Sequence, residues 1–288
     1  MCGRYWMDDD SLDLRKIAEE MNRSPLMSRW AEIKRSAAVS RREEINGSSL
    51  ASRQEEIEQS APVNSLEETT AVKTAGEILP TDIVPVIAPD RNGERAVYPM
   101  KWGYTGKSLL INARSETAAQ KMTFRDDWAR HRCIVPASWY FEWEHFKENG
   151  GKMRTGDSFD PVLPGITLSP DALTGSAKNS RSGMQKYRIK PKSSDMTWLC
   201  GLYRIENGMP VFVILTREPG EEIRFIHDRM PLIMPEELVN EWIRPDAKPE
   251  ELLPHALTEM TFARATGAPD DFAFPCADRD GVSKGGRK

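Results

Sequence analysis

The sequence predicts an α+β fold: a single domain with a mainly antiparallel sheet or open barrel-like core, a few flanking helices and two polar insertions. Segments with strand character outnumber those with helical periodicity. The predicted elements do not alternate regularly between strand and helix, as those around a parallel sheet would. Two long stretches are too polar to form a core. At 288 residues the chain is long enough to bury a substantial core in one domain.

The first helix is predicted at residues 8–21, where Leu12, Ile17 and Met21 alternate with charged residues and acidic residues stand near the start. The helical pattern over residues 115–132 predicts a second helix, though its spacing is irregular. Short apolar or aromatic runs predict strands at residues 83–88, 96–100, 133–135 and 139–143.

The second half of the chain predicts three more strands, over residues 186–190, 197–205 and 210–216. Gly201 is interpreted as a bend, and Asn207-Gly208 as the turn of a hairpin. A last helix is expected over residues 235–243, which begin with Pro and two Glu.

Two polar stretches, at about residues 35–76 and 147–184, are interpreted as insertions because they lack the apolar content to fold alone. We expect residues 1–266 to form the domain that carries both, and residues 267–288 to be a mobile tail.

The charge balance is slightly acidic, with 40 Lys and Arg against 44 Asp and Glu. This argues against a protein that nucleic acid or an anionic membrane holds by bulk charge. Residues 101–132, however, hold 7 Lys and Arg against 3 acids. Trp102, Tyr104 and Trp128 interleave with these charges, a pattern that suits a path for single-stranded nucleic acid. A solvated helix face is the ordinary alternative.

The four cysteines, at positions 2, 133, 200 and 276, form no CxxC pair, which argues against a disulfide scaffold or a zinc ribbon. The sequence contains neither a P-loop nor a GxGxxG motif, and we predict no cofactor and no bound metal. Neither a secretory signal nor an apolar stretch of about 20 residues is found. We therefore expect a cytoplasmic protein without membrane contact.

Cys2 is the first candidate for chemistry. If Met1 is removed, the chain begins with a 1,2-aminothiol whose amine is partly neutral near neutral pH. An amine attacks an aldehyde to give a Schiff base, and the adjacent thiol then closes a thiazolidine ring. The alternative is a cysteine that merely follows Met1.

Asn112 and Arg114 are the second candidates, because residues two apart lie on the same side of an extended backbone. Arg114 could bind a phosphate or carboxylate and Asn112 could hydrogen-bond a nucleophile. The alternative is a helix start in which both satisfy the backbone.

Glu142 and His227 are candidates for proton transfer. Aromatic residues surround Glu142 in the run WYFEW, and desolvation there would raise the pKa of its carboxyl group. On an alternating strand it could instead face water. His227 lies beside Asp228 and Arg229 and could move protons near neutral pH, although a lone His in a turn is more often structural.

Six motifs occur in order along the chain: MCGR at 1–4, KWGY at 101–104, INARSET at 111–117, RCIVPASWYFEW at 132–143, WLCGLY at 198–203 and IHDRMPLIM at 226–234. In these six motifs and in their order, the chain resembles the SOS response-associated peptidase (SRAP) family. The resemblance covers most of the chain apart from the insertions and the tail.

The resemblance implies a sensor of abasic sites in single-stranded DNA that cross-links to them, and an autopeptidase that removes Met1. Cys2 would be the cross-linking nucleophile, and Asn112 would hold the N-terminus and the sugar. Glu142 would assist opening of the deoxyribose ring, and His227 would move protons during Schiff-base chemistry. The expected DNA contacts are Arg4, Arg114, Arg229 and Trp102. We expect a monomer, associated with the nucleoid when bound to DNA.

The chain departs from the family pattern at two places. Residues 76–80 are GEILP where the family has Tyr-Asn before Ala-Pro, so Glu77 replaces an amide near the N-terminus. The loop at 104–108 is shortened and lacks the Pro and Trp that wedge beside the lesion.

Two alternatives of other classes remain open. An N-terminal-cysteine amidohydrolase, such as a glutaminase domain, would use Cys2 to attack an amide and Arg114 to hold a carboxylate. A non-covalent binding module for single-stranded DNA would keep the fold and the DNA groove but form no adduct.

Overall fold

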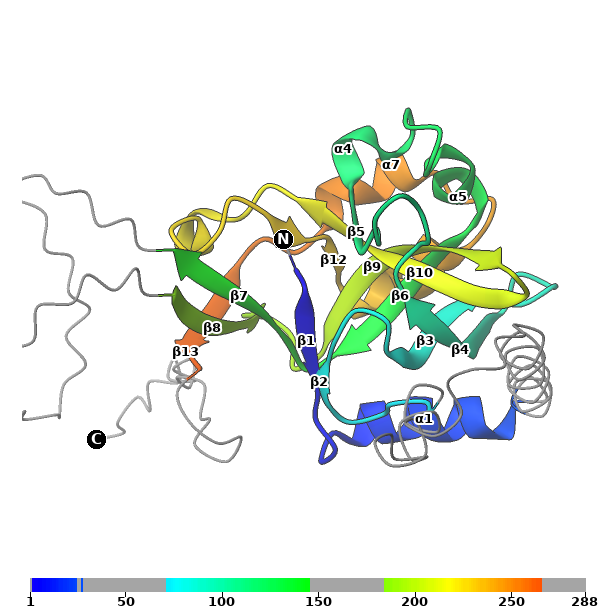
Figure 1. The fold of residues 1–288 in the computed structure, drawn as a ribbon, viewed down its shortest axis with the longest axis horizontal. Helices are drawn as coiled ribbons and strands as arrows, with labels where there is room; N and C mark the ends of the chain where they lie inside the picture. Colours follow the sequence, from blue (N-terminus) through cyan, green and yellow to red (C-terminus); the bar gives the residue numbers. More distant parts are fainter. Residues whose placement is uncertain (1, 25–26, 28–70, 146–183, 266–288) are drawn as a thin grey trace, which may run out of the picture.

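The computed structural model describes residues 2–24, 27, 71–145 and 184–265 (Figure 1). The predicted insertions fall almost entirely outside these residues, and the predicted tail falls wholly outside them. Among the described residues, no helix is both long and apolar enough to cross a membrane.

The described strands are β1 (Arg4–Met7), β2 (Gly76–Ile78), β3 (Ile83–Pro89), β4 (Arg95–Trp102), β5 (Asn112–Arg114), β6 (Arg132–Ala137), β7 (Trp139–His145), β8 (Met184–Pro191), β9 (Thr197–Glu206), β10 (Met209–Arg217), β11 (Met230–Pro231), β12 (Ile233–Met234) and β13 (Met260–Arg264). The helices are α1 (Leu12–Arg23), α4 (Ser115–Ala118), α5 (Arg125–Arg130), α6 (Val239–Ile243) and α7 (Pro249–Leu252). Short 3-10 turns lie at Glu221–Ile223, Glu236–Leu238 and Leu253–His255.

The core of the fold is a closed barrel. Strand β3 pairs with β4, β4 with β10, β10 with β9, β9 with β6, and β6 with β3 again. Every pair in this ring is antiparallel except β4 with β10, which run parallel. The predicted class, a mainly antiparallel sheet with few helices, is confirmed, and the barrel is closed where an open one was expected.

A second sheet, in the order β13-β8-β7-β1-β2, holds the N-terminal strand β1 between β7 and the edge strand β2. In Figure 1, β1 stands between the barrel and the strands β7, β8 and β13. Strand β1 pairs with β7 so that Tyr5 lies opposite Tyr140 and Arg4 opposite Phe141. Successive side chains of a strand point to opposite faces. Tyr5 and Tyr140, both fully buried, therefore lie on the inner face, while Arg4 lies on the outer face.

The first predicted helix is present as α1, which begins at Leu12 rather than at residue 8. The Ser11 hydroxyl caps it by accepting a hydrogen bond from the Leu14 N–H at 3.4 Å. The helix buries Leu14, Ile17 and Met21. Burial of Ile17 and Met21 is as predicted, whereas Leu12, the third apolar residue of the prediction, is 68% exposed.

The single helix predicted over residues 115–132 is wrong. The segment forms two short helices, α4 and α5, and its last residue already belongs to strand β6. Arg132 is fully buried, and its guanidinium donates hydrogen bonds to the carbonyl oxygens of Trp128, Ala129, Trp242, Arg244 and Ala247. These bonds join α5 to α6 and the segment after it.

The other predicted strands are present with longer bounds, and the last predicted helix is a 3-10 turn followed by α6. Asn207 and Gly208 form the expected hairpin turn, with φ values of 51° and 79°. Gly201 does not bend the chain but lies within β9, opposite Ile214. A Cβ atom there would lie 2.8 Å from the Val213 carbonyl oxygen, so close packing in the barrel accounts for this glycine.

Candidate functional site

Cys2 lies directly before β1, at the point where the barrel and the second sheet meet. Its side chain is fully buried. The side-chain amide of Asn112, the first residue of β5, donates a 2.8 Å hydrogen bond to the Cys2 carbonyl oxygen. Burial, and then the negative charge of Glu142, raise the pKa of the Cys2 thiol, so the sulfur is held as a neutral thiol. The side chain of Asn112, on the strand β5 that pairs with the barrel, thus fixes the position of residue 2.

Glu142 lies on the inner face of β7 and is only 3% exposed. Desolvation by burial raises the pKa of its carboxyl group to about 7, with the nearby Asp228 charge adding to the rise. A group with that pKa exchanges protons readily near neutral pH. The interpretation of Glu142 as a water-facing residue is therefore excluded, because alternation turns its side chain inward.

The turn before β11 carries His227, Asp228 and Arg229. The Nδ1 atom of His227 accepts a 3.0 Å hydrogen bond from the Arg229 N–H and lies 2.8 Å from Asp228 Oδ1. Since Asp228 acts on the pKa of Glu142, this turn faces the same site as β7. The structure therefore brings together three predicted residues, Cys2, Asn112 and Glu142, and places His227 in a turn whose Asp228 acts on the Glu142 carboxyl group.

The three predicted phosphate-binding arginines differ in their partners. Arg229 makes a bidentate ion pair with Glu116, at 2.9 and 2.8 Å. Arg4 pairs with Glu77 at 3.3 Å. Arg114 is exposed and has no ion pair within the described ranges. Only Arg114 is thus ready to bind an anion without breaking an existing contact.

The ring centre of Trp102 lies 5.4 Å from that of Tyr5, but the ring is not accessible to DNA. Its side chain is fully buried, lies 6.1 Å from Phe212 in a stacked arrangement, and donates a hydrogen bond to the Ile111 carbonyl oxygen at 3.0 Å. Tyr104 and Trp128 are buried as well, at 0% and 4% exposed. Burial of hydrophobic surface, rather than base stacking, accounts for these three rings.

Two tyrosines of the site were not predicted from the sequence. Tyr5 and Tyr140 are fully buried, and neither hydroxyl has a hydrogen-bond partner within the described residues. Burial raises the pKa of both phenols, and the charge of Asp82 adds to the rise at Tyr5 and that of Glu142 to the rise at Tyr140. Buried polar atoms usually have partners, so these hydroxyls are suited to contact a bound molecule. Strand alternation from Glu142 could have placed Tyr140 on the same face.

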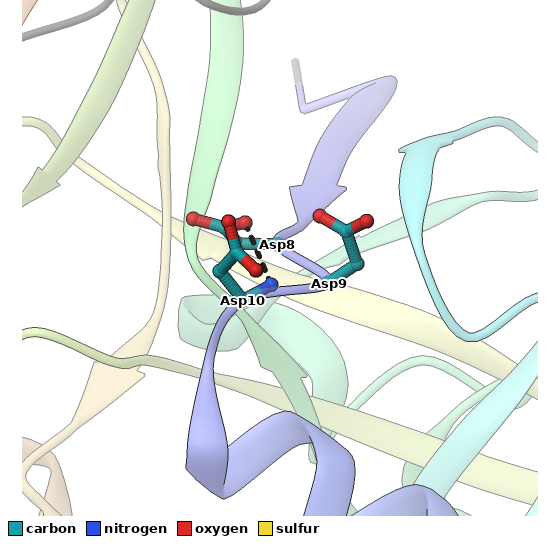
Figure 2. A group of neighbouring side chains, drawn as sticks. All are labelled: Asp8, Asp9 and Asp10. Carbon is teal, nitrogen blue, oxygen red and sulfur yellow. Dashed lines mark hydrogen bonds between the residues drawn. The ribbon is translucent and has the colours of Figure 1, made fainter.

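Three consecutive aspartates, Asp8, Asp9 and Asp10, gather their carboxylates in the turn before α1 (Figure 2). The Asp10 N–H donates to Asp8 Oδ1 at 3.1 Å, and Arg15 pairs with Asp10 at 3.1 Å. These contacts explain the cluster as a turn and a helix start. A hollow between the β3–β4 turn and the end of α6 shares no residue with the Cys2 site.

The Cys2 site combines three chemical elements. It has a sulfur three bonds from the nitrogen of its own residue, a carboxyl group with a pKa of about 7, and an amide that holds the carbonyl oxygen of Cys2. Such a set can transfer protons to and from a carbonyl compound while a nitrogen and a sulfur add to it.

The sequence matches the family described as SOS response associated peptidase (SRAP) over residues 1–156 and 176–266. Among curated relatives, the abasic site processing protein YoqW of Bacillus subtilis is 33% identical over 141 residues, which cover 47% of this chain and 48% of that protein. YoaM of the same organism is 31% identical over 52% of this chain and 56% of its own length. YedK of Escherichia coli is 27% identical over 58% and 63%. The chain thus spans about half the length of the first curated relatives it matches.

Among solved structures, a phage-related protein of Bordetella bronchiseptica is 20% identical, with a TM-score of 0.49 over 67% of this chain and 82% of that one. A protein of Bacteroides thetaiotaomicron is 20% identical, with a TM-score of 0.46 over 66% and 78%.

Proposed function

The chain belongs to the SOS response associated peptidase (SRAP) family, and from this premise we propose that it processes abasic sites in single-stranded DNA. In this proposal the protein forms a covalent adduct with the open-chain sugar through Cys2, after Met1 has been removed. The relatives named abasic site processing proteins support the substrate.

One observation carries the proposal on this chain's own residues. The Asn112 amide holds the Cys2 carbonyl oxygen at 2.8 Å, while the buried Glu142 carboxyl group acts on the same residue. Addition to an aldehyde requires a nucleophile held in position and a group close to it that transfers protons.

The first step is attack of the Cys2 amine on the C1′ aldehyde of the abasic sugar. A carbon–nitrogen bond forms, and the aldehyde oxygen takes up a proton to give a carbinolamine. Loss of that hydroxyl as water yields the Schiff base. Glu142, with a pKa of about 7, is present in both protonation states near neutral pH and can accept the amine proton and then protonate the leaving hydroxyl.

The second step closes the ring. The Cys2 sulfur adds to the imine carbon, and the thiol proton ends on the nitrogen, so the thiazolidine contains the atoms of the aldehyde and the aminothiol less one water. Because burial raises the pKa of the thiol, the sulfur is a poor nucleophile before the imine forms, which favours attack by the amine first.

Removal of Met1 is part of the proposal, since an amide nitrogen at Cys2 could not form the imine. Cleavage adds one water across the Met1–Cys2 peptide bond. Glu142 is the carboxyl group best suited to assist it, because its charge acts on Cys2 directly. His227 would then move protons when the imine forms and when it is reversed.

The DNA backbone would be held by Arg114 and by Arg4 and Arg229 around the lesion. A guanidinium donates paired hydrogen bonds to a phosphate, which suits all three. Arg114 is exposed, and Arg4 is exposed over 42% of its side chain. Trp102 is left out of this set because its ring is fully buried.

The test is an adduct that survives heat and denaturant when the purified protein is mixed with an oligonucleotide carrying one abasic site. Cys2→Ala should form no such adduct. An oligonucleotide with a tetrahydrofuran site, which lacks the aldehyde, should give none with the wild-type protein. A Cys2→Ala adduct equal to wild type would overturn the assignment of Cys2, and tight binding without any adduct would favour the non-covalent module.

A further inference from the structure

An acidic side chain lies between two basic ones on the outer face of the second sheet. The Glu77 carboxylate of β2 lies 3.3 Å from Arg4 of β1 and 2.6 Å from Lys186 of β8. Both contacts go to the same oxygen, Oε1. Two positive charges thus share one negative charge, and the group of three carries a net charge of +1.

This group is partly open to solvent. The side chains of Arg4, Glu77 and Lys186 are 42%, 30% and 27% exposed. Exposed ion pairs contribute little to stability because water competes for both partners. The contacts of Glu77 can therefore be exchanged for those of another anion at small cost.

Each of the two basic groups lies over the face of an aromatic ring. Lys186 Nζ lies 3.9 Å from the ring centre of Phe141, and the Arg4 guanidinium lies 5.5 Å from that of Trp143. Both rings belong to β7, on either side of Glu142 in sequence. Basic groups over aromatic rings are the usual surface for single-stranded nucleic acid. Of the two rings, Trp143 is partly exposed, whereas Phe141 is only 5% exposed and contacts Lys186 without offering a face to a base.

We propose that Glu77 occupies, in the free protein, the position of a DNA phosphate between Arg4 and Lys186, and that it lowers affinity for nucleic acid until a phosphate displaces it. The inference rests on the proposed function, because it assumes that DNA follows this face. A carboxylate and a phosphate accept the same hydrogen bonds from a guanidinium and an ammonium group. The displaced Glu77 would then repel the strand, so it limits binding to DNA that other contacts already hold.

The experiment measures binding of a fluorescein-labelled oligothymidine, without abasic sites, at several salt concentrations. Each phosphate neutralised on a single strand adds about 0.7 to the slope of log affinity against log salt. Glu77→Gln frees one positive charge and should steepen the slope by about 0.7, which is about fivefold in affinity for each tenfold dilution of salt. Glu94→Gln, an equal loss of charge at an exposed turn, should leave the slope unchanged.

A second pair of variants repeats the comparison without placing two unpaired cations side by side. Lys186→Gln leaves Arg4 paired with Glu77 and should make the slope shallower by about 0.7. Adding Glu77→Gln to Lys186→Gln should restore the wild-type slope.

The outcomes separate the two proposals. If the wild-type protein binds the oligothymidine and Glu77→Gln changes the slope in neither background, Glu77 is only a structural ion pair and the inference is wrong. If neither the wild-type protein nor Glu77→Gln binds, DNA does not follow this face and the inference is wrong, whereas the proposed function is decided separately by the adduct assay. Binding by Glu77→Gln that wild type lacks at the same salt supports the inference in its strongest form.

Discussion

The side-chain amide of Asn112 donates a 2.8 Å hydrogen bond to the carbonyl oxygen of Cys2, a residue 110 positions earlier in the sequence. The bond joins β5, which pairs with β10 of the barrel, to the start of β1 in the second sheet. It therefore fixes the backbone of Cys2 relative to β5 without touching the sulfur.

Asn112→Ala should slow adduct formation while leaving the fold intact. Loss of one such hydrogen bond costs about 1 kcal/mol, and misplacement of the amine adds to it, so we expect a decrease of about tenfold or more in rate. The measurement is the single-turnover rate on an abasic oligonucleotide, with Asn92→Ala as the control at an exposed turn. An unchanged rate would show that Asn112 does not position Cys2.

Glu142→Gln should lower the rate of adduct formation by about 10²- to 10⁴-fold, the usual contribution of an acid–base group. The wild-type rate should also change with pH around 7, where Glu142 titrates, and the variant should lack this change. Glu144→Gln, the same exchange two residues further along β7, should keep the wild-type profile. A pH profile shared by Glu142→Gln and wild type would assign the titration to another group.

The pKa of Glu142 also predicts how stability varies with pH. Its pKa is about 7 in the folded protein against an ordinary 4.5, so the folded state binds its proton more tightly than the unfolded chain does. This contribution is complete below pH 4.5 and is lost as pH rises to about 7, by about 3 kcal/mol in total. Urea unfolding of wild type and Glu142→Gln between pH 4.5 and 8 should show this difference. A constant difference between the two would contradict the raised pKa.

Arg132→Lys should destabilise the fold without altering the chemistry of the site. Lysine cannot reproduce hydrogen bonds to five separate carbonyl oxygens, so buried acceptors lose their partner. We expect a loss of about 3 kcal/mol in the free energy of unfolding. Arg130→Lys, at an exposed neighbouring position, is the control. A loss equal to that of the control would mean that these hydrogen bonds contribute little.

The strands and the first helix could be predicted because their apolar spacing is local. Ile17 and Met21, four residues apart, are buried on one face of α1 as predicted, whereas Leu12 is exposed and Leu14 takes its place in the buried face. The prediction for residues 115–132 was wrong because their irregular apolar spacing was interpreted as one helix. The position of Arg132 depends on carbonyl groups more than 100 residues away, which local spacing does not reveal.

The candidate site could be predicted from its motifs, but its electrostatic partners could not. The contact of Glu77 with Lys186 depends on how β2, β1, β7 and β8 are ordered in the sheet, which local spacing does not encode. Trp102 shows the converse error. Its basic neighbours suggested nucleic acid, whereas its place in the ring of barrel strands buries it.

The most direct test of the central claim is the intact mass of the species formed with abasic single-stranded DNA. The account predicts one covalent product, with the mass of the chain without Met1 plus that of the oligonucleotide less one water. Cys2→Ala should give only the two separate masses. A covalent product that retains Met1, or one that Cys2→Ala forms equally well, would contradict a thiazolidine at Cys2.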